Sequence, residues 1–389
     1  MRRSNSAACI DVLRERSSCT VTYLAARTGL SRPTVESILT ELTEYGLVIG
    51  DAVEEHGIGR PARTYLFNAD AAYVASVDVG LHQTTGMLAD LKGHILETIR
   101  LEMPPEIDAI ARAASVRGLL RALLESTDVP AALLHTAVVA VPGIVDPQGR
   151  MVLSNPIPDW TGANLAARFK EGLPTHVIVE NDVNMAALAE HRLGAGRFAD
   201  DLLLVHVGHR VNAGMILGGA LRRGHNYSAG EIADVINPRD ADTTPLATVV
   251  ASEVVQAAAR GDAEAVASLR EFATRVSTTF ALVSAAIDPQ LIVVGGGLSG
   301  AGETLVGPIR EAIRALVHGR GIPEIVVSQL GSDGVVLGGL ARALQAVNAD
   351  LYHAPDLGIP TLKAPARATT APADGASHPA TSSTSIINP

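Results

Sequence analysis

The chain has 389 residues, of which 47% are hydrophobic, so it is long enough for two or three domains with substantial cores. No run approaches the ~18 uninterrupted apolar residues of a membrane span, which excludes a membrane protein, and Asp11 and Arg14 interrupt any signal-peptide core, which excludes an exported one. The only cysteines are Cys9 and Cys19, which excludes a disulfide scaffold. We therefore expect a cytoplasmic protein. The formal charge of −10 is carried by residues after 68, because residues 1–68 balance eight Arg against eight Asp and Glu, so a contact with nucleic acid is expected in that first segment.

Residues 20–45 predict two helices separated by a tight turn. Thr20 is placed to cap the first helix, Gly29 supplies a left-handed turn residue, and Ser31 is placed to cap the second helix ahead of Pro33. The second helix has an apolar stripe and, on its other face, short polar groups and an arginine that suit the major groove of DNA. The stripe is Val35, Ile38, Leu39 and Leu42, and the candidate DNA-contacting residues are Ser31, Arg32, Thr34 and Ser37.

Residues 46–67 read as a strand, a glycine-rich tip and a second strand, which is typical of a wing. Arg60 lies between Gly59 and Pro61 at the tip, a position suited to entering a minor groove. The wing favours a winged helix-turn-helix domain over residues 1–70 rather than the alternative, an ordinary helical hairpin with a solvated face.

From Tyr73 onward, strands and helices alternate and glycines follow the strands, as in α/β lobes. A first hairpin carries Asp78 and Gly80 and returns to a turn at residues 92–93, and residues 106–126 predict a long amphipathic helix. Further along the chain, polar residues and glycines follow predicted strands, at the sheet edge that faces the crevice in such folds. They are Asn155, Asn181, Asp182, Gly208, Gly214, Glu231 and Gly296.

The order and spacing of these motifs resemble the ROK family of repressors, open reading frames and sugar kinases. The resemblance is carried by Asp78-x-Gly80, Val141-Pro142-Gly143, Ser154-Asn155-Pro156, Glu180-Asn181-Asp182, Ala229-Gly230-Glu231 and Gly295-Gly296-Gly297-Leu298. It implies an actin-like (ribonuclease H-like) α/β fold of two lobes over residues 71–350. Residues 351–389, rich in Ala, Pro, Ser and Thr, are then expected to form a disordered tail.

The resemblance also implies roles for the site residues. Asp182 matches the family's catalytic base, Asn155, Asn181 and Glu231 match residues that hold sugar hydroxyls, and the nucleotide-site remnants are Asp78, Gly80, Gly208, Gly214 and Gly296. The simpler alternative is that Asn181 and Asp182 only cap the helix that follows them.

The sequence departs from the family pattern in both phosphate loops and at the zinc site. Leu81 and His82 stand where a small residue and a threonine are usual, and His209, Arg210 and Asn212 interrupt the second glycine-rich loop. Asp234 takes the place of a zinc-binding histidine, and no cysteine follows residue 19, so tetrahedral zinc lacks ligands. We therefore expect no zinc, weakened ATP binding and a remnant base at Asp182 that no longer catalyses.

The sequence as a whole predicts a transcriptional regulator, most simply a repressor. It is expected to bind an inverted-repeat operator as a homodimer or homotetramer and to sense a sugar or sugar phosphate through a degenerate kinase-like domain. Two alternatives stay open. One is an active ATP-dependent sugar kinase with a DNA-binding head, and the other is a ligand-independent scaffold for dimerisation or protein docking.

Overall fold

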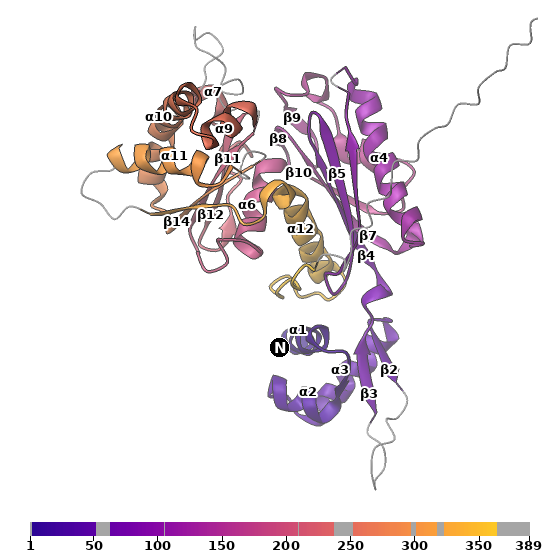
Figure 1. Ribbon diagram of the computed structural model, residues 1–389. Helices are drawn as coiled ribbons and strands as arrows, with labels where there is room; N and C mark the ends of the chain where they lie inside the picture. Colours follow the sequence, from indigo (N-terminus) through magenta and orange to yellow (C-terminus); the bar gives the residue numbers. More distant parts are fainter. Residues whose placement is uncertain are drawn as a thin grey trace, which may run out of the picture.

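The computed structural model describes residues 2–51, 63–104, 106–208, 210–236, 252–296, 301–316 and 323–363. They form a small head and two α/β lobes, and one long helix lies between the lobes (Figure 1). None of the helices in this part of the chain is both long and apolar enough to cross a bilayer.

The head contains the two predicted helices with the predicted caps. Helix α2 (Val21–Thr28) begins at Thr20, whose hydroxyl accepts a hydrogen bond from Tyr23 N, and ends at Gly29, which has a left-handed φ of 71°. Helix α3 (Arg32–Glu44) begins at Ser31, whose hydroxyl accepts from Thr34 N. The side chains of the predicted apolar stripe are buried: Val35, Ile38, Leu39 and Leu42.

A three-stranded sheet and a further helix complete the head. Strand β3 (Thr64–Phe67) pairs antiparallel with β2 (Val48–Asp51) and with β1 (Cys19–Thr20), which confirms the predicted wing strands. The wing tip, with Arg60, lies outside the described residues. Helix α1 (Arg2–Glu15) was not predicted; it contacts α2 and α3 and contributes buried Cys9, Ile10 and Leu13 to the head core.

The first lobe is a five-stranded sheet in the order β6-β5-β4-β7-β10, with α4 and α5 on one side. Strands β4, β5 and β6 form an antiparallel meander, and β7 and β10 extend it in parallel from β4. A short hairpin, β8 and β9, follows β7. The bounds are β4 (Tyr73–Val79), β5 (Gln83–Asp90), β6 (Ile95–Glu102), α4 (Ala109–Ser126), β7 (Leu134–Val141), β8 (Ile144–Val145), β9 (Met151–Leu153), α5 (Leu165–Lys170) and β10 (His176–Asn181).

The second lobe repeats the same strand order as β13-β12-β11-β14-β15, again with a three-stranded meander and two parallel strands. This duplication is the predicted actin-like arrangement. Helices α9, α10 and α11 pack around one core of this lobe. The bounds are β11 (Leu202–Val207), β12 (Val211–Leu217), β13 (Ala220–Leu221), α7 (Ala233–Ile236), α9 (Ser252–Ala259), α10 (Ala263–Ile287), β14 (Leu291–Gly295), α11 (Glu303–Leu316) and β15 (Glu324–Val327).

Two packed helices, α6 (Asp182–Arg192) and α12 (Gly334–Asp350), join the lobes (Figure 1). Two glycines in α12 allow its close approach to both neighbours. A Cβ on Gly338 would lie 1.9 Å from the Met185 carbonyl oxygen of α6, and a Cβ on Gly339 would lie 2.0 Å from Ser76 Oγ of β4. Helix α12 therefore packs without slack against elements of both lobes.

Residues 351–363 pack against the head and the first lobe. Lys363 N donates to the Gly93 carbonyl oxygen at 2.8 Å, and the Lys363 carbonyl oxygen accepts from Ile95 N at 2.8 Å. The apolar side chains of Tyr352, Leu357 and Leu362 supply the buried contacts that order this stretch. A disordered tail can thus begin no earlier than residue 364, and residues 364–389 lie outside the described part of the chain.

Candidate functional site

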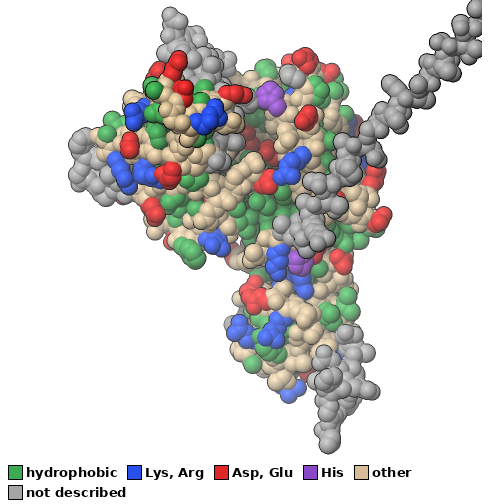
Figure 2. Space-filling model, viewed as in Figure 1, with side chains coloured by type: hydrophobic (Ala, Val, Ile, Leu, Met, Phe, Trp, Pro, Cys, Tyr) green, Lys and Arg blue, Asp and Glu red, His purple; other side chains and the backbone are tan. Residues whose placement is uncertain are grey.

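A cleft of about 520 Å³ lies between the lobes and is visible as a hollow in Figure 2. Its size suits a small-molecule ligand. The lining comes from the ends of strands in both lobes and from the first residues of α6 and α12. Most of the predicted site residues line it, namely Asp78, Gly80, Asn155, Asp182, Gly208, Glu231 and Gly296.

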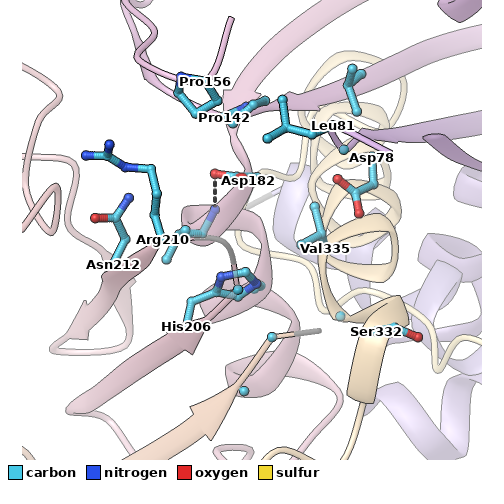
Figure 3. A pocket seen from close by; sticks show the side chains of 18 of the residues that line it. Asp78, Leu81, Pro142, Pro156, Asp182, His206, Arg210, Asn212, Ser332 and Val335 are labelled. Carbon is cyan, nitrogen blue, oxygen red and sulfur yellow. Dashed lines mark hydrogen bonds between the residues drawn. The ribbon is translucent and has the colours of Figure 1, made fainter. Parts of the chain in front are cut away.

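Among the carboxyl groups that line this cleft, Asp78 lies near the end of β4 and Asp182 at the start of α6 (Figure 3). Burial raises the pKa of Asp78 to about 7, and the charge of Asp333 adds to the rise. Burial, followed by the charges of Asp78 and Glu231, raises the pKa of Asp182 well above its usual value. Asp78 can therefore hold a proton near neutral pH, and both shifts indicate that the cleft disfavours negative charge.

Glu231 is held by two amide side chains. Asn181 Nδ2 donates to Glu231 Oε1, and Asn212 Nδ2 donates to Glu231 Oε2, each at 3.0 Å. Asn181 Nδ2 also donates to the Gly143 carbonyl oxygen at 3.0 Å, so both of its donors are in use. Asn181 Oδ1 accepts from Asn184 N at 2.8 Å and caps α6. The simpler role considered for Asn181, a helix cap, is thus present together with a role in positioning Glu231.

Asn212 also holds the segment that follows Glu231. Its Oδ1 accepts from Ala233 N, the first residue of α7, at 3.0 Å. Gly230 has a φ of 87°, and a Cβ there would lie 1.9 Å from the Ala213 carbonyl oxygen, so only glycine allows this turn to reach β12. The side chain of Asn212 is 8% exposed, and its two hydrogen bonds tie β12, Glu231 and α7 into one unit.

The first loop, residues 80–83, lies against a buried arginine. Arg112 Nη1 donates to the carbonyl oxygens of Gly80, at 2.8 Å, and Leu81, at 3.2 Å. Burial lowers the pKa of Arg112. Gly80 has no room for a side chain, because a Cβ would lie 2.5 Å from the Gln83 carbonyl oxygen. Leu81, which departs from the family pattern, lines the cleft and packs against the first-lobe core.

In the second loop, Gly208, Arg210 and Asn212 line the cleft, whereas His209 lies outside the described residues. His206 lies beside this loop, and burial lowers its pKa to about 4, so the imidazole is neutral. Gly214 does not line the cleft; a Cβ there would lie 2.6 Å from Ala187 Cβ, which explains the glycine by the contact of β12 with α6. Gly296 has a φ of 101° and directly follows β14 beside the cleft.

The residues present do not fit the zinc ion of the resembled family. Cys9 and Cys19, the two cysteines of the sequence, are buried in the head. Asp234 lies in α7, but its side chain and residues 237–251 fall outside what the structure describes. Within the described ranges, no group of three or more His, Cys, Asp or Glu side chains could hold a metal.

The head presents the predicted polar residues of α3 on its surface. Ser31, Arg32 and Ser37 are exposed, and Thr34 is half-buried with its hydroxyl 2.8 Å from that of Ser31. At the base of the wing, Arg63 is exposed and lies over the Tyr65 ring, with its guanidinium carbon 5.3 Å from the ring centroid. Lys and Arg side chains gather on the head in Figure 2.

Sequence reasoning missed three residues of these sites. Asn212 was noted only as a departure from a glycine pattern, although an amide in a buried loop usually has hydrogen-bond partners. Arg112 lies within the predicted amphipathic helix, where a single arginine carries no distinct signal. Arg63 lies three residues after Arg60, and its position directly before the second wing strand, β3, was the available signal.

Comparison with known proteins adds family information to this geometry. The ROK family model matches residues 74–242 and 237–346, and the model of the IclR helix-turn-helix domain matches residues 5–52. A glucokinase of Streptomyces coelicolor is 26% identical over 72% of this chain and 97% of its own length. A xylose repressor of Caldicellulosiruptor bescii is 23% identical over 83% of this chain and 91% of its own. The crystal structure of a ROK family transcriptional regulator, a homologue of E. coli MLC, superposes with a TM-score of 0.66 and 21% identity, covering 90% of this chain and 98% of that one.

Proposed function

Since the chain belongs to the ROK family and carries an IclR-type helix-turn-helix, we propose that it is a transcriptional regulator that binds operator DNA through its head and a sugar in its cleft. The observation that carries the proposal is the presence, in one chain, of a DNA-binding type of head packed against a kinase-like body. The resemblance to a xylose repressor over most of both chains supports the same combination of DNA and sugar. Repression in the cytoplasm is the simplest form of this function.

The head is proposed to place α3 in a major groove and the wing beside a minor groove. Ser31, Arg32, Thr34 and Ser37 lie at the N-terminal end of α3, where such helices contact base edges. Arg63 and the predicted Arg60 would then serve the wing. Two heads in a homodimer or homotetramer would engage both halves of an inverted repeat, which raises affinity over that of one head.

We propose that the cleft binds an uncharged sugar through hydrogen bonds to its hydroxyl groups. Asn155, Asp182 and Glu231 line it, and carboxylate and amide groups suit hydroxyl partners. A phosphate on the ligand would add negative charge beside Asp78 and Asp182, whose pKa values are already raised by burial and by neighbouring carboxylates. This favours a free sugar over a sugar phosphate, although Arg210, the one Lys or Arg side chain among the described residues of this lining, would offset such a charge.

A sugar kinase is the second candidate, and a specific observation supports it. Asp182 lies in the cleft, where a carboxylate can accept the proton of an attacking hydroxyl, and a glucokinase matches most of the body. Leu81 and Arg210 occupy the loops that would hold a triphosphate, so we expect the base to remain and transfer to be lost.

Selection from a randomised duplex DNA library tests the DNA-binding proposal without knowledge of the target gene. We expect the full chain to enrich an inverted repeat, and the Arg32→Ala variant, relative to Ser4→Ala on α1 as a control, to bind the enriched duplex more weakly by ~1–3 kcal/mol. Failure to enrich any sequence would overturn the proposal.

The sugar-sensing part is tested by thermal shift with D-glucose, D-xylose, N-acetyl-D-glucosamine and their phosphates, because a ligand of the folded state raises the melting temperature. An increase with a free sugar only is the expected result. An increase with phosphates only would contradict the charge argument, and no increase across the panel would favour the ligand-independent scaffold.

A further inference from the structure

One helix reaches from the cleft to the head. The first residues of α12, Gly334 and Val335, line the cleft, and Asp333 just before them pairs with Arg100 of β6 at 2.7 Å. The other end of α12 meets the head, where Asn348 is fully buried. A single helix of 17 residues therefore connects the cleft with the head.

The middle of α12 has little freedom to absorb a displacement. Gly338 packs directly on the backbone of α6, the helix that begins with Asp182. Gly339 packs on Ser76 of β4, the strand that carries Asp78. The helix that begins with Asp182 and the strand that carries Asp78 therefore both contact α12 closely, and a shift of either one is passed to α12 as a rigid body.

At the far end, Arg14 of α1 joins the head to α12 and to the chain that follows it. Its Nη2 donates to Asn348 Oδ1 at 3.0 Å, and its Nη1 donates to the Gly358 carbonyl oxygen at 3.2 Å. Its guanidinium carbon lies 4.9 Å from the ring centroid of Tyr352 and 5.6 Å from that of Phe67 in the wing strand β3. One side chain thus contacts the last turn of α12, the segment after it and the wing.

The junction around Arg14 is incompletely satisfied. Arg14 Nε is buried and has no hydrogen-bond partner in the described structure. A cavity of about 400 Å³, lined by Ala7, Asp11 and residues 353–358, separates α1 from the segment after α12. This open space leaves room for α1 to move relative to the segment that follows α12.

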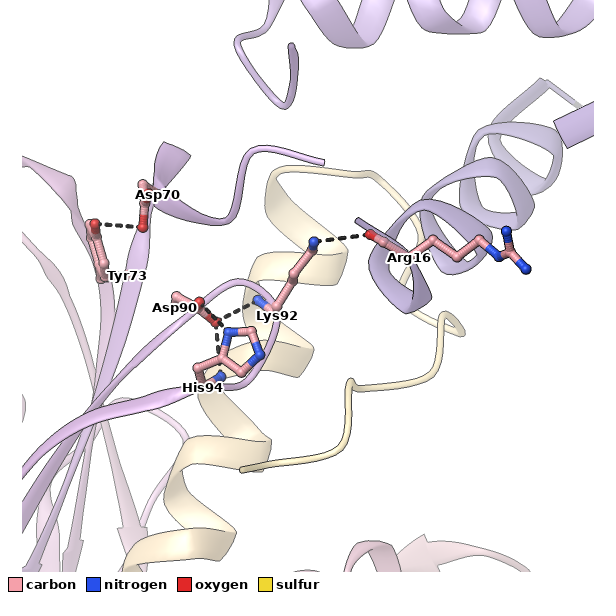
Figure 4. Close-up of polar contacts among 6 residues, drawn as sticks. All are labelled: Arg16, Asp70, Tyr73, Asp90, Lys92 and His94. Atoms are coloured by element: carbon pink, nitrogen blue, oxygen red, sulfur yellow. Dashed lines mark hydrogen bonds and ion pairs between the residues drawn. The ribbon is translucent and has the colours of Figure 1, made fainter. Parts of the chain in front are cut away.

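A second contact between body and head lies just after the end of α1 and does not involve α12. Lys92 Nζ, in the turn between β5 and β6, donates to the Arg16 carbonyl oxygen at 3.2 Å (Figure 4). The turn is held by Asp90, whose carboxylate accepts from the backbone N of Lys92 and of His94 and contacts the His94 ring. This contact provides a matched control, because it joins head and body two residues after Arg14 without involving α12.

We propose that α12 transmits the state of the cleft to the DNA-binding head, and that Arg14 is the positioning residue through which it does so. The inference rests on the proposed regulatory function for its purpose, but its test uses the protein alone. A sugar that closes the lobes would shift α6 and β4, move α12 with them, and change the hold of Asn348 on Arg14. The orientation of the wing and of α3 relative to the body would then change, and operator affinity depends on that orientation.

Amide hydrogen exchange of the full chain, without DNA or sugar, tests the mechanical part of this proposal. In Arg14→Met and in Asn348→Leu, we expect exchange across residues 334–341, at the cleft end of α12, to become about tenfold faster than in the wild type, because charge-assisted hydrogen bonds at the other end are lost. In Lys92→Met the same residues should exchange at the wild-type rate. Retained protection of α2 and α3 shows that the head is folded in each variant.

The reverse direction uses Asp333→Asn, which breaks the pair with Arg100 beside the cleft. We expect amides of α1 to exchange about two- to fivefold faster, as fits the loss of a half-exposed ion pair. Changes confined to α1 and residues 351–363 in the first two variants, with no change of α1 in Asp333→Asn, would overturn the proposal. Because neither operator nor sugar is involved, that result would leave the proposed function itself standing.

Discussion

Replacing Asn212 by alanine should loosen the wall of the cleft that presents Glu231. The substitution removes a charge-assisted hydrogen bond to Glu231 Oε2 and a neutral one from Ala233 N, both 3.0 Å long and both buried. Bonds to charged groups contribute ~1.5–3 kcal/mol and neutral ones ~0.5–1.5 kcal/mol, so the expected loss of stability is ~2–4 kcal/mol. For a body of this size, that loss lowers the melting temperature by ~4–10 °C.

The assay is thermal unfolding of the full chain combined with calorimetric titration of whichever free sugar raises the melting temperature. Gln83→Ala is the matched control, because Gln83 also lines the cleft and makes no hydrogen bond through its side chain in the described structure. We expect Gln83→Ala to leave the melting temperature within ~1 °C of the wild type. If Asn212→Ala melts like this control and binds sugar like the wild type, the proposed role of Asn212 in holding Glu231 and α7 is wrong.

Further expectations concern the same cleft. Asn155→Ala and Glu231→Ala should each weaken sugar binding by ~1–3 kcal/mol and spare operator binding; equal sugar affinity in all three proteins would place the ligand elsewhere. Asp182→Asn should leave repression without ligand intact, and a coupled assay with millimolar ATP and common hexoses should detect no sugar-dependent ADP; turnover that disappears in this variant would restore the kinase. The folded-state pKa of Asp78 is raised to about 7, so its ionisation costs stability that accumulates between pH ~4 and ~7. Asp78→Asn should therefore raise the melting temperature at pH 8 and leave it unchanged at pH 4, and a gain independent of pH would refute the assignment. Metal analysis should find less than stoichiometric zinc, and one tightly held ion per chain would reveal ligands outside the described residues.

The sequence predicted those parts of the molecule whose local signals agree with their environment. The caps at Thr20 and Ser31 and the left-handed Gly29 depend on interactions within three or four residues, so the pattern alone located both helices of the turn. The alternation of strands and helices indicated two lobes, and the family motifs placed Asp78 and Asp182 together. Periodicity and motif order were therefore sufficient for the fold and for the position of the cleft.

Contacts between segments that are distant in the sequence could not be predicted from the sequence pattern. Helix α1 begins with polar residues, and its burial of Ile10 and Leu13 depends on the rest of the head. Residues 351–363 have the composition of a tail, yet Tyr352 and Leu357 find apolar partners in the body and the head. The amide of Asn212 has its partners 19 and 21 residues away, a separation that no local pattern specifies.

The charge of Arg14 is stabilised without a carboxylate partner. In the described structure it contacts the Asn348 amide oxygen, the Gly358 carbonyl oxygen and two aromatic faces, and Arg14, Asn348 and both aromatic residues are buried. Dissolved ions screen exposed charge pairs over ~10 Å at 0.1 M but act little on such buried dipolar contacts. Phosphate contacts, by contrast, weaken steeply as ionic strength rises. Increasing the salt concentration should thus release the protein from DNA while head and body keep their relative orientation. The dependence of operator affinity on salt concentration would then report the number of phosphate contacts.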